Sequence, residues 1–190
     1  MSERSEASPC APAALQELLL SRITDVPDYP KPGVMFKDIT PLLSDPVAFG
    51  ALTDAFVELC ARHRADKVVG LEARGFILAA PVAVRAGIGF VPVRKAGKLP
   101  GATLGQAYEL EYGTAEIEIH ADALAPGDRV LVIDDVLATG GTADASLQLI
   151  RRAGAEVAGL AVLMELGFLA GRQRLSPGLR GAPLEALITV

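Results

Sequence analysis

The segment VLVIDDVLATGGT at residues 130–142 decides how the fold is interpreted. Its first four residues are a continuous apolar run rich in β-branched side chains, which is typical of a buried parallel strand. Two carboxylates, Asp134 and Asp135, end the strand, and a turn of small residues follows before a helix expected over residues 142–153. In open α/β sheets, ligands bind at the carboxyl ends of the strands. The segment therefore predicts both an α/β fold and the place of its site.

The turn at residues 139–142, TGGT, has the chemistry of an anion site. At a helix N-terminus it would present backbone N–H groups and two hydroxyls, where the helix dipole favours negative charge. Gly140 and Gly141 remove side chains that would block close approach. Asp134 and Asp135 suit vicinal hydroxyls, which are hydrogen-bond donors. Together these groups predict a site for a sugar that carries a phosphate.

Two common phosphate-binding motifs are excluded. The glycines at 70 and 75 have P-loop spacing, but Phe76 stands where that motif requires lysine. Gly87 and Gly89 are followed by Pro92 where a dinucleotide-binding motif requires its third glycine. A plain strand–turn–helix with capping threonines is the structural alternative, and the paired aspartates argue against it.

The rest of the chain alternates strands and helices, which predicts an α/β fold with a mainly parallel central sheet. We expect a loop over residues 94–107 that is too long for a simple connector. We expect an irregular, proline-stiffened segment from residue 25 to 33. The other expected elements are helices over residues 13–23, 46–64 and 76–85, strands over 67–71, 89–93 and 157–164, and a hairpin insert of strands 109–111 and 115–120.

Composition limits the classes of function. We expect a mobile tail over residues 1–11 and a single domain over residues 12–190. The net charge of −5 argues against nucleic acid as a partner. No apolar run is long enough for a membrane span, and the acidic N-terminus does not resemble a signal peptide. We therefore expect a cytoplasmic protein. Cys10 and Cys60 have no partner at metal-ligand spacing.

Residues 130–142 resemble the phosphoribosyl-pyrophosphate signature of the type I phosphoribosyltransferases. The resemblance implies that family's fold, with helices flanking the sheet, a small N-terminal hood over about residues 12–43 and a hairpin lid over about 94–112. It implies that Asp134 and Asp135 contact the ribose hydroxyls, and that the phosphate-binding loop, residues 138–142, holds the 5-phosphate. The members of this loop are Ala138, Thr139, Gly140, Gly141 and Thr142. It also implies Mg²⁺ as cofactor, carried mainly by the substrate phosphates without a protein metal cage.

Residues 29–43, YPKPGVMFKDITPLL, resemble the adenine-recognition segment of adenine phosphoribosyltransferases. An aromatic ring held beside prolines offers a stacking face for a flat base. By resemblance, Phe36 stacks on adenine, the main chain of Met35 and Lys37 reads its edge, and Leu166 covers the opposite face. The alternative is that Met35 and Phe36 are simply core residues.

Two further segments resemble the family's pyrophosphate site. The first is GLEARGF at residues 70–76, which implies that Ala73 and Arg74 bind pyrophosphate and that a cis peptide lies near Glu72. A guanidinium offers paired donors that match phosphate oxygens, although Arg74 could instead be a surface arginine. The second is RKAGKLPGATLGQAYELEY at residues 94–112, the expected lid. Its residues implied to bind pyrophosphate are Arg94, Lys95, Lys98 and Tyr112.

The resemblance implies transfer of the phosphoribosyl group to adenine, giving AMP and pyrophosphate in purine salvage. Glu111 and Arg74 would be catalytic, Glu111 as acid/base for a purine proton, unless it is only an exposed strand carboxylate. Arg94 would reach the neighbouring site of a homodimer. Two other functions stay open: the same reaction with hypoxanthine, xanthine or orotate, and a regulator that binds the donor without turnover. Residues 173–190 are expected not to touch the site.

Overall fold

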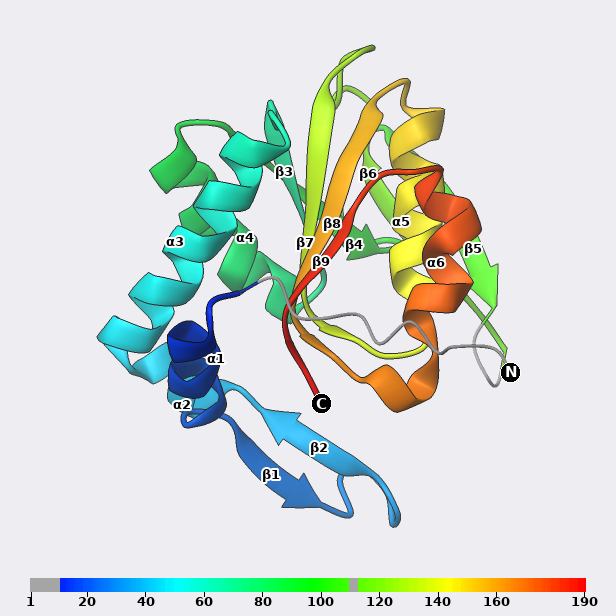
Figure 1. The fold of residues 1–190 in the computed structure, drawn as a ribbon. Helices are drawn as coiled ribbons and strands as arrows, with labels where there is room; N and C mark the ends of the chain where they lie inside the picture. The colour runs from blue at the N-terminus through cyan, green and yellow to red at the C-terminus, as the bar shows by residue number, and fades with distance from the viewer. Residues whose placement is uncertain (1–10, 110–112) are drawn as a thin grey trace, which may run out of the picture.

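A computed structural model describes residues 11–109 and 113–190. Its centre is a seven-stranded sheet in the order β5-β6-β4-β3-β7-β8-β9 (Figure 1). The strands are β3 (Lys67–Leu71), β4 (Gly89–Lys95), β5 (Thr103–Glu109), β6 (Thr114–His120), β7 (Arg129–Leu137), β8 (Glu156–Glu165) and β9 (Leu184–Thr189). Strands β4, β3, β7, β8 and β9 pair in parallel, and β5 and β6 form an antiparallel arm on the edge of β4. The expected α/β fold with a mainly parallel sheet is confirmed.

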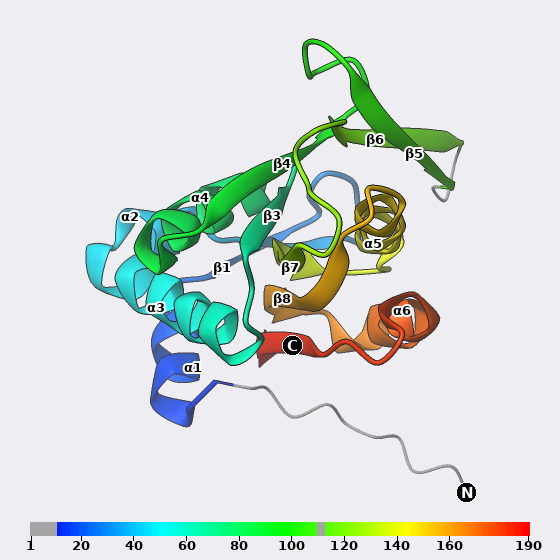
Figure 2. The same ribbon diagram turned by 90° about the horizontal axis from the view of Figure 1, so that it is seen from above.

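Helices cover both faces of the sheet (Figure 2). One side carries α1 (Ala13–Leu20), α2 (Thr40–Ser44), α3 (Pro46–Arg62) and α4 (Arg74–Ala86), and the other carries α5 (Gly141–Arg152) and α6 (Gly171–Leu179). Alternation along β7 explains the two layers, because successive side chains of a strand point to opposite faces. Leu131 and Ile133 pack in the core under α3 and α4, while Val130 and Val132 pack in the core under α5.

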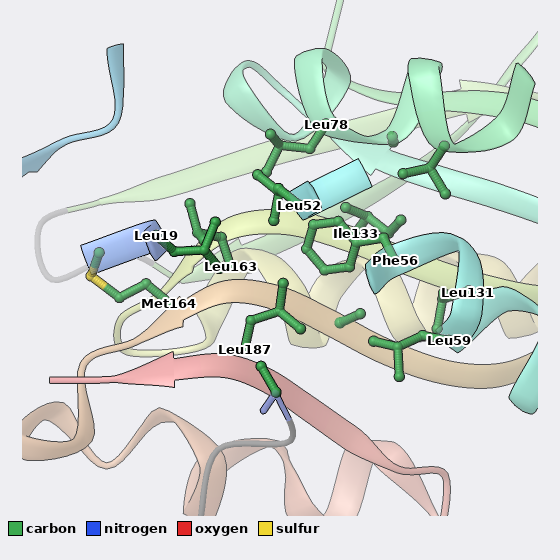
Figure 3. Packing of buried hydrophobic residues seen from close by; sticks show 14 of the residues in the cluster. Leu19, Leu52, Phe56, Leu59, Leu78, Leu131, Ile133, Leu163, Met164 and Leu187 are labelled. Carbon is green, nitrogen blue, oxygen red and sulfur yellow. The ribbon is translucent and has the colours of Figure 1, made fainter. Parts of the chain in front are cut away.

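The core beneath α3 and α4 fixes the N-terminal segment to the sheet (Figure 3). Phe56 of α3 is fully buried, as are Leu78 of α4 and Leu19 of α1. Ala11, the last residue of the expected tail, is also buried against this core. Helix α3 begins where the sequence predicted, since the Asp45 carboxylate accepts hydrogen bonds from the N–H groups of Val47 at 2.9 Å and Ala48 at 3.2 Å.

The segment expected to be irregular, residues 25–33, covers most of the first strand and most of the turn of an antiparallel hairpin. The hairpin consists of β1 (Thr24–Pro27) and β2 (Met35–Asp38). The irregular part is confined to the turn, where the Tyr29–Pro30 peptide is cis and Gly33 has a φ of +84°. Prolines mask a strand in sequence because they cannot donate to a ladder, yet at an edge or a strand end they are tolerated. The hairpin projects from α1 and α2 at one end of the molecule (Figure 1).

Two expected boundaries are wrong. Strand β7 continues through Leu137, so Asp134 and Asp135 lie within the strand instead of ending it. Only half of the expected loop at residues 94–107 is irregular, because β4 extends to Lys95 and β5 begins at Thr103. Both extensions have the same cause: pairing with a neighbouring strand satisfies backbone groups that local sequence does not assign. The expected strand 109–111 lies mostly outside the described residues.

Candidate active site

An ion pair joins β7 to the start of α4. Arg74 Nε lies 2.7 Å from Asp135 Oδ2, and the Asp135 side chain is only 7% exposed. The two atoms are close but not aligned as a hydrogen bond, so Oδ2 has no hydrogen-bond partner among the described residues. Buried carboxylate oxygens are normally satisfied. This oxygen is closed to solvent in the structure, and the Arg74 guanidinium balances its charge.

Asp134 has the opposite electrostatic environment. Burial, and then the neighbouring charge of Asp135, raise the pKa of Asp134 well above its usual range. Its Oδ1 accepts the Asp135 N–H at 2.9 Å. A Cβ on Gly75 would lie 2.9 Å from Asp134 Oδ1 and from the Ile133 carbonyl oxygen, so α4 starts directly against β7. Only glycine allows this approach, which places the Arg74 segment beside the paired carboxylates.

The phosphate-binding loop has the geometry expected of an anion site. Gly140 has a φ of +81° and stands at the N-cap of α5 without a side-chain cap, so the first N–H groups of the helix stay open. A cavity of about 270 Å³ adjoins the loop. It is lined by Asp134 and residues 138–142 together with Val136, Leu137, Ala143, Tyr108, Glu109 and Arg174. The structure thus brings the phosphate-binding loop and Asp134 together, as expected.

Helix α6 touches the site, so the expectation that residues 173–190 do not is wrong. A Cβ on Gly171 would collide with the Ala138 carbonyl oxygen, and one on Gly140 would lie 3.1 Å from the Gly171 oxygen. These close approaches pack the start of α6 against the phosphate-binding loop and bring Arg174 to the cavity. No local pattern identified Arg174, because its position depends on the return of the chain after β8.

The hairpin β1–β2 places Phe36 beside the carboxylates. The Arg74 Cζ lies 5.1 Å from the centre of the Phe36 ring, and the Tyr29 ring meets Phe36 edge-on with centroids 5.1 Å apart. Met35 is 50% exposed, so it is not a core residue. The Lys37 side chain is paired with that of Asp25 at 2.7 Å, its partner across the hairpin. Phe36, Arg74 and Asp135 thus form a continuous row.

The segment after β3 is tied to the start of the expected lid. The Glu72–Ala73 peptide is cis, as the resemblance implied. The Glu72 carboxylate accepts the Lys95 N–H at 2.9 Å, and Arg94 Nε lies 3.3 Å from the same Oε2. These contacts bring Ala73, Arg94 and Lys95 into one region at the carboxyl ends of β3 and β4.

Glu118 of β6 binds the basic turn, residues 96–102, which connects β4 to β5. Glu118 was not identified from the sequence. Its Oε1 accepts the N–H groups of Lys98 at 3.1 Å and Leu99 at 3.0 Å, and the residue is 7% exposed. The Leu99 N–H is the largest of the contributions that hold the pKa of this carboxyl below its usual range. In sequence Glu118 is one acid of an alternating strand, and only strand pairing shows that it faces the turn.

Glu111 and Tyr112 lie outside the described residues. Strand β5, which ends at Glu109, reaches the phosphate-binding loop, since the Tyr108 and Thr142 hydroxyls lie 3.4 Å apart. Tyr108 was not identified from the sequence. Leu166 follows β8, is half-buried, and donates its N–H to the Leu137 carbonyl at 2.9 Å. Its position opposite Phe36 stays a prediction.

Comparison with protein families matches residues 50–176 to the phosphoribosyl transferase domain. The match spans β3, β4, β7 and β8, and with them residues 70–76 and the phosphate-binding loop. The chain therefore belongs to the phosphoribosyltransferase family.

Within the family, its relatives are adenine phosphoribosyltransferases. The enzyme of Streptomyces coelicolor is 78% identical over 179 residues, covering 94% of this chain and 98% of its own. That of Thermobifida fusca is 62% identical, over 88% of this chain and 93% of its own. The crystal structure of the Rhodothermus marinus enzyme has a TM-score of 0.87 at 49% identity, covering 94% of this chain and all of the other. A Saccharomyces cerevisiae enzyme, solved with an imino-altritol bisphosphate and adenine, has a TM-score of 0.86 at 38% identity over 93% and 99% of the chains.

Proposed function

We propose that this protein transfers the 5-phosphoribosyl group from phosphoribosyl pyrophosphate to adenine and releases pyrophosphate and AMP. The observation that carries the proposal is the row formed by Phe36, Arg74 and Asp135, which joins a stacking face to a guanidinium and a buried carboxylate. A base on Phe36 would have its ribose at Asp134 and Asp135. The relatives, named for the same activity, support the proposed reaction.

The base site consists of Phe36 for stacking, Leu166 for the opposite face, and the main chain of Met35 and Lys37 for the purine edge. Main-chain groups suit this role because they read hydrogen-bonding edges in a fixed geometry. The ion pair between Lys37 and Asp25 supports it, since it holds the charged side chain away from the base. The 5-phosphate is assigned to the phosphate-binding loop.

The pyrophosphate site consists of Ala73, Arg74, Arg94, Lys95, Lys98 and Tyr112. Contacts of Glu72 with Arg94 and Lys95 support the grouping. Residues 11–109 and 113–190 contain no group of three or more side chains able to hold a metal. We propose that Mg²⁺ arrives on the donor's phosphates, where it would neutralise phosphate charge, because magnesium prefers phosphate and water ligands.

In the reaction, purine N9 forms a bond to the anomeric carbon as the bond to the pyrophosphate oxygen breaks. Positive charge develops on the sugar ring and negative charge on the leaving group. Arg74, Lys95 and Lys98 would stabilise the leaving group. Glu111 is assigned as the acid/base that handles the purine proton, and Tyr112 would pack beside it. Residues 94–112 would close to exclude water from the cation-like sugar.

Purified protein is expected to form AMP from adenine and phosphoribosyl pyrophosphate when Mg²⁺ is present. Product should be assayed chromatographically with adenine, hypoxanthine, xanthine and orotate in parallel. A higher kcat/KM for another base than for adenine would contradict the base assignment. Tight binding of the donor, with RNA or DNA binding and no nucleotide formed from any base, would favour the regulator instead.

Glu118→Gln is expected to raise the KM for phosphoribosyl pyrophosphate about three- to tenfold with a smaller change in kcat. The neutral amide is a weaker acceptor for the Lys98 and Leu99 N–H groups, which removes roughly 1 kcal/mol from the anchor of the basic turn. Steady-state kinetics at pH 7–8 would measure the changes in KM and kcat. Because the pKa of Glu118 is lowered, the wild-type anchor is complete above the ordinary carboxyl range and weakens only as the pH falls through that lowered value. Glu116→Gln, a change in the same strand, is the matched control.

The expected homodimer, with Arg94 reaching the neighbouring site, stays a prediction, to be checked by sedimentation in solution. The cytoplasmic location, the absence of a nucleic-acid partner and the boundaries of hood and lid also stay predictions. Among the described residues, no helix is long and apolar enough to cross a membrane.

A further inference from the structure

Arg174 of α6 lies over the phosphate-binding loop. Its Nη2 and Cζ atoms are 3.7 Å and 3.9 Å from the point that a Cβ on Gly141 would occupy. The guanidinium therefore lies at ordinary contact distance from the first residue of α5. It lines the same cavity as residues 138–142, at the N-terminal end of α5.

The position of Arg174 is set by packing of its helix. Leu175 is fully buried, and its Cγ would lie 3.1 Å from a Cβ on Gly140. Gly171, at the start of α6, is in close contact with the Ala138 carbonyl. These contacts pack α6 against Ala138 and Gly140 of the phosphate-binding loop, so the backbone of Arg174 is held beside the loop.

The charges around the cavity indicate that Arg174 binds a ligand and not a carboxylate of the protein. Among the described residues that line the cavity, Arg174 is the only cation. It forms no ion pair with a carboxylate of residues 11–109 or 113–190. Asp144, the acid in the first turn of α5, instead accepts a hydrogen bond from Gln148 at 2.8 Å. The loop itself offers only neutral N–H and hydroxyl donors, whereas a phosphate monoester carries up to two negative charges.

We propose that Arg174 is a phosphate-binding residue of this site, donating to an oxygen of the 5-phosphate held by residues 138–142. The proposal rests on the proposed function, in which this loop holds the 5-phosphate. A guanidinium beside a helix N-terminus combines charge-assisted hydrogen bonds with the helix dipole, and both favour a phosphate. Arg174 contacts a group that stays unchanged through the reaction. It therefore contributes to binding donor and nucleotide alike and not to the chemical step.

The test is the binding of phosphorylated ligands to Arg174→Ala. We expect the Kd for AMP and for ribose 5-phosphate, by calorimetry, to rise about tenfold, as for loss of one charge-assisted hydrogen bond. The KM for phosphoribosyl pyrophosphate should rise similarly. The kcat, and the KM for adenine at saturating donor, should stay within about twofold, since uniform binding of a remote group affects KM alone. Arg174→Lys, which keeps the charge, should recover part of the affinity.

Arg180→Ala is the matched control, because Arg180 is an exposed arginine at the C-cap of the same helix. It should bind AMP as the wild type does. Unchanged AMP affinity in Arg174→Ala would overturn the proposal. So would an equal rise in the adenine KM, which would indicate general distortion of the loop, or a loss of affinity in Arg174→Lys as large as in Arg174→Ala. Failure of the wild-type protein to bind AMP would instead contradict the proposed function.

Discussion

Arg74→Ala is expected to lower kcat/KM for phosphoribosyl pyrophosphate by about 10²- to 10³-fold, the largest loss among the described residues. Hydrogen bonds from a charged donor contribute roughly 1.5–3 kcal/mol each, and a guanidinium can offer two to a pyrophosphate. The same side chain pairs with Asp135 and lies over the Phe36 ring. Its removal therefore affects the leaving group, the ribose site and the base site together. Steady-state kinetics with each substrate varied in turn would measure the loss.

The Tm of Arg74→Ala measures what the ion pair between Arg74 and Asp135 contributes to stability, separately from what Arg74 contributes to the reaction. Without Arg74, the buried carboxylate of Asp135 loses its cationic partner. The arginine side chain is 36% exposed, so solvent screening reduces the cost to about 1–2 kcal/mol. We expect a Tm lower by several degrees, since 1 kcal/mol corresponds to about 2–4 °C in a chain of this size. Combining Arg74→Ala with Asp135→Asn should restore most of the Tm and none of the activity.

Arg74→Lys is the control for charge alone. It keeps a cation near Asp135 but loses the paired donors, so Tm should stay near the wild-type value while kcat/KM falls at least tenfold. Wild-type kinetics in this variant would show that a point charge suffices. Wild-type kinetics in Arg74→Ala would remove Arg74 from the site.

The sequence predicted those parts of the site that are contiguous in the chain. Residues 138–142 form the expected turn at the start of a helix, and Asp45 caps α3 as expected, because backbone conformation there depends on neighbouring side chains. Strand β3 matches residues 67–71 without error. Turn residues stand on both sides of its apolar run, and they determine where the strand begins and ends.

Contacts between distant segments could not be predicted from the residues alone. Arg174 reaches the phosphate-binding loop only because α6 packs against it through Gly171. Glu118 holds the basic turn because β6 pairs with β4 and β5 in one register. Phe36 and Arg74 were each assigned to a subsite by resemblance, but their contact depends on how the hairpin β1–β2 projects. Tertiary packing, and not local propensity, determines all three.

Asp134→Asn is expected to stabilise the free protein while lowering kcat/KM for phosphoribosyl pyrophosphate by roughly 100-fold. Burial and the charge of Asp135 both disfavour the ionised form of Asp134, and the amide removes that cost. The same change weakens the acceptor for a ribose hydroxyl, and charged hydrogen bonds contribute about 1.5–3 kcal/mol. Opposite effects on stability and activity are common at sites whose charges are arranged for a ligand.

The pH dependence of this variant distinguishes electrostatic relief from a general packing effect. Because the pKa of Asp134 is raised in the folded state, folding is favoured when the group is protonated, and wild-type stability decreases as the pH rises toward that raised value. Asparagine does not titrate. The Tm values of the two proteins should therefore lie close together near pH 4 and differ most at higher pH, by a few degrees if the gain is about 1 kcal/mol.

Asp135→Asn is the matched control, and its Tm should change in the opposite direction. Asp135 has a cationic partner 2.7 Å away, so the amide removes a favourable interaction with Arg74 and should lower Tm while also weakening ribose binding. Calorimetric scans from pH 4 to pH 8 would compare the three proteins. If Asp134→Asn raised Tm equally at every pH, its effect would not be electrostatic. If it lowered Tm at neutral pH, ionised Asp134 would stabilise the fold. The assignment of Asp134 as destabilising and of Asp135 as stabilised by Arg74 would then be wrong.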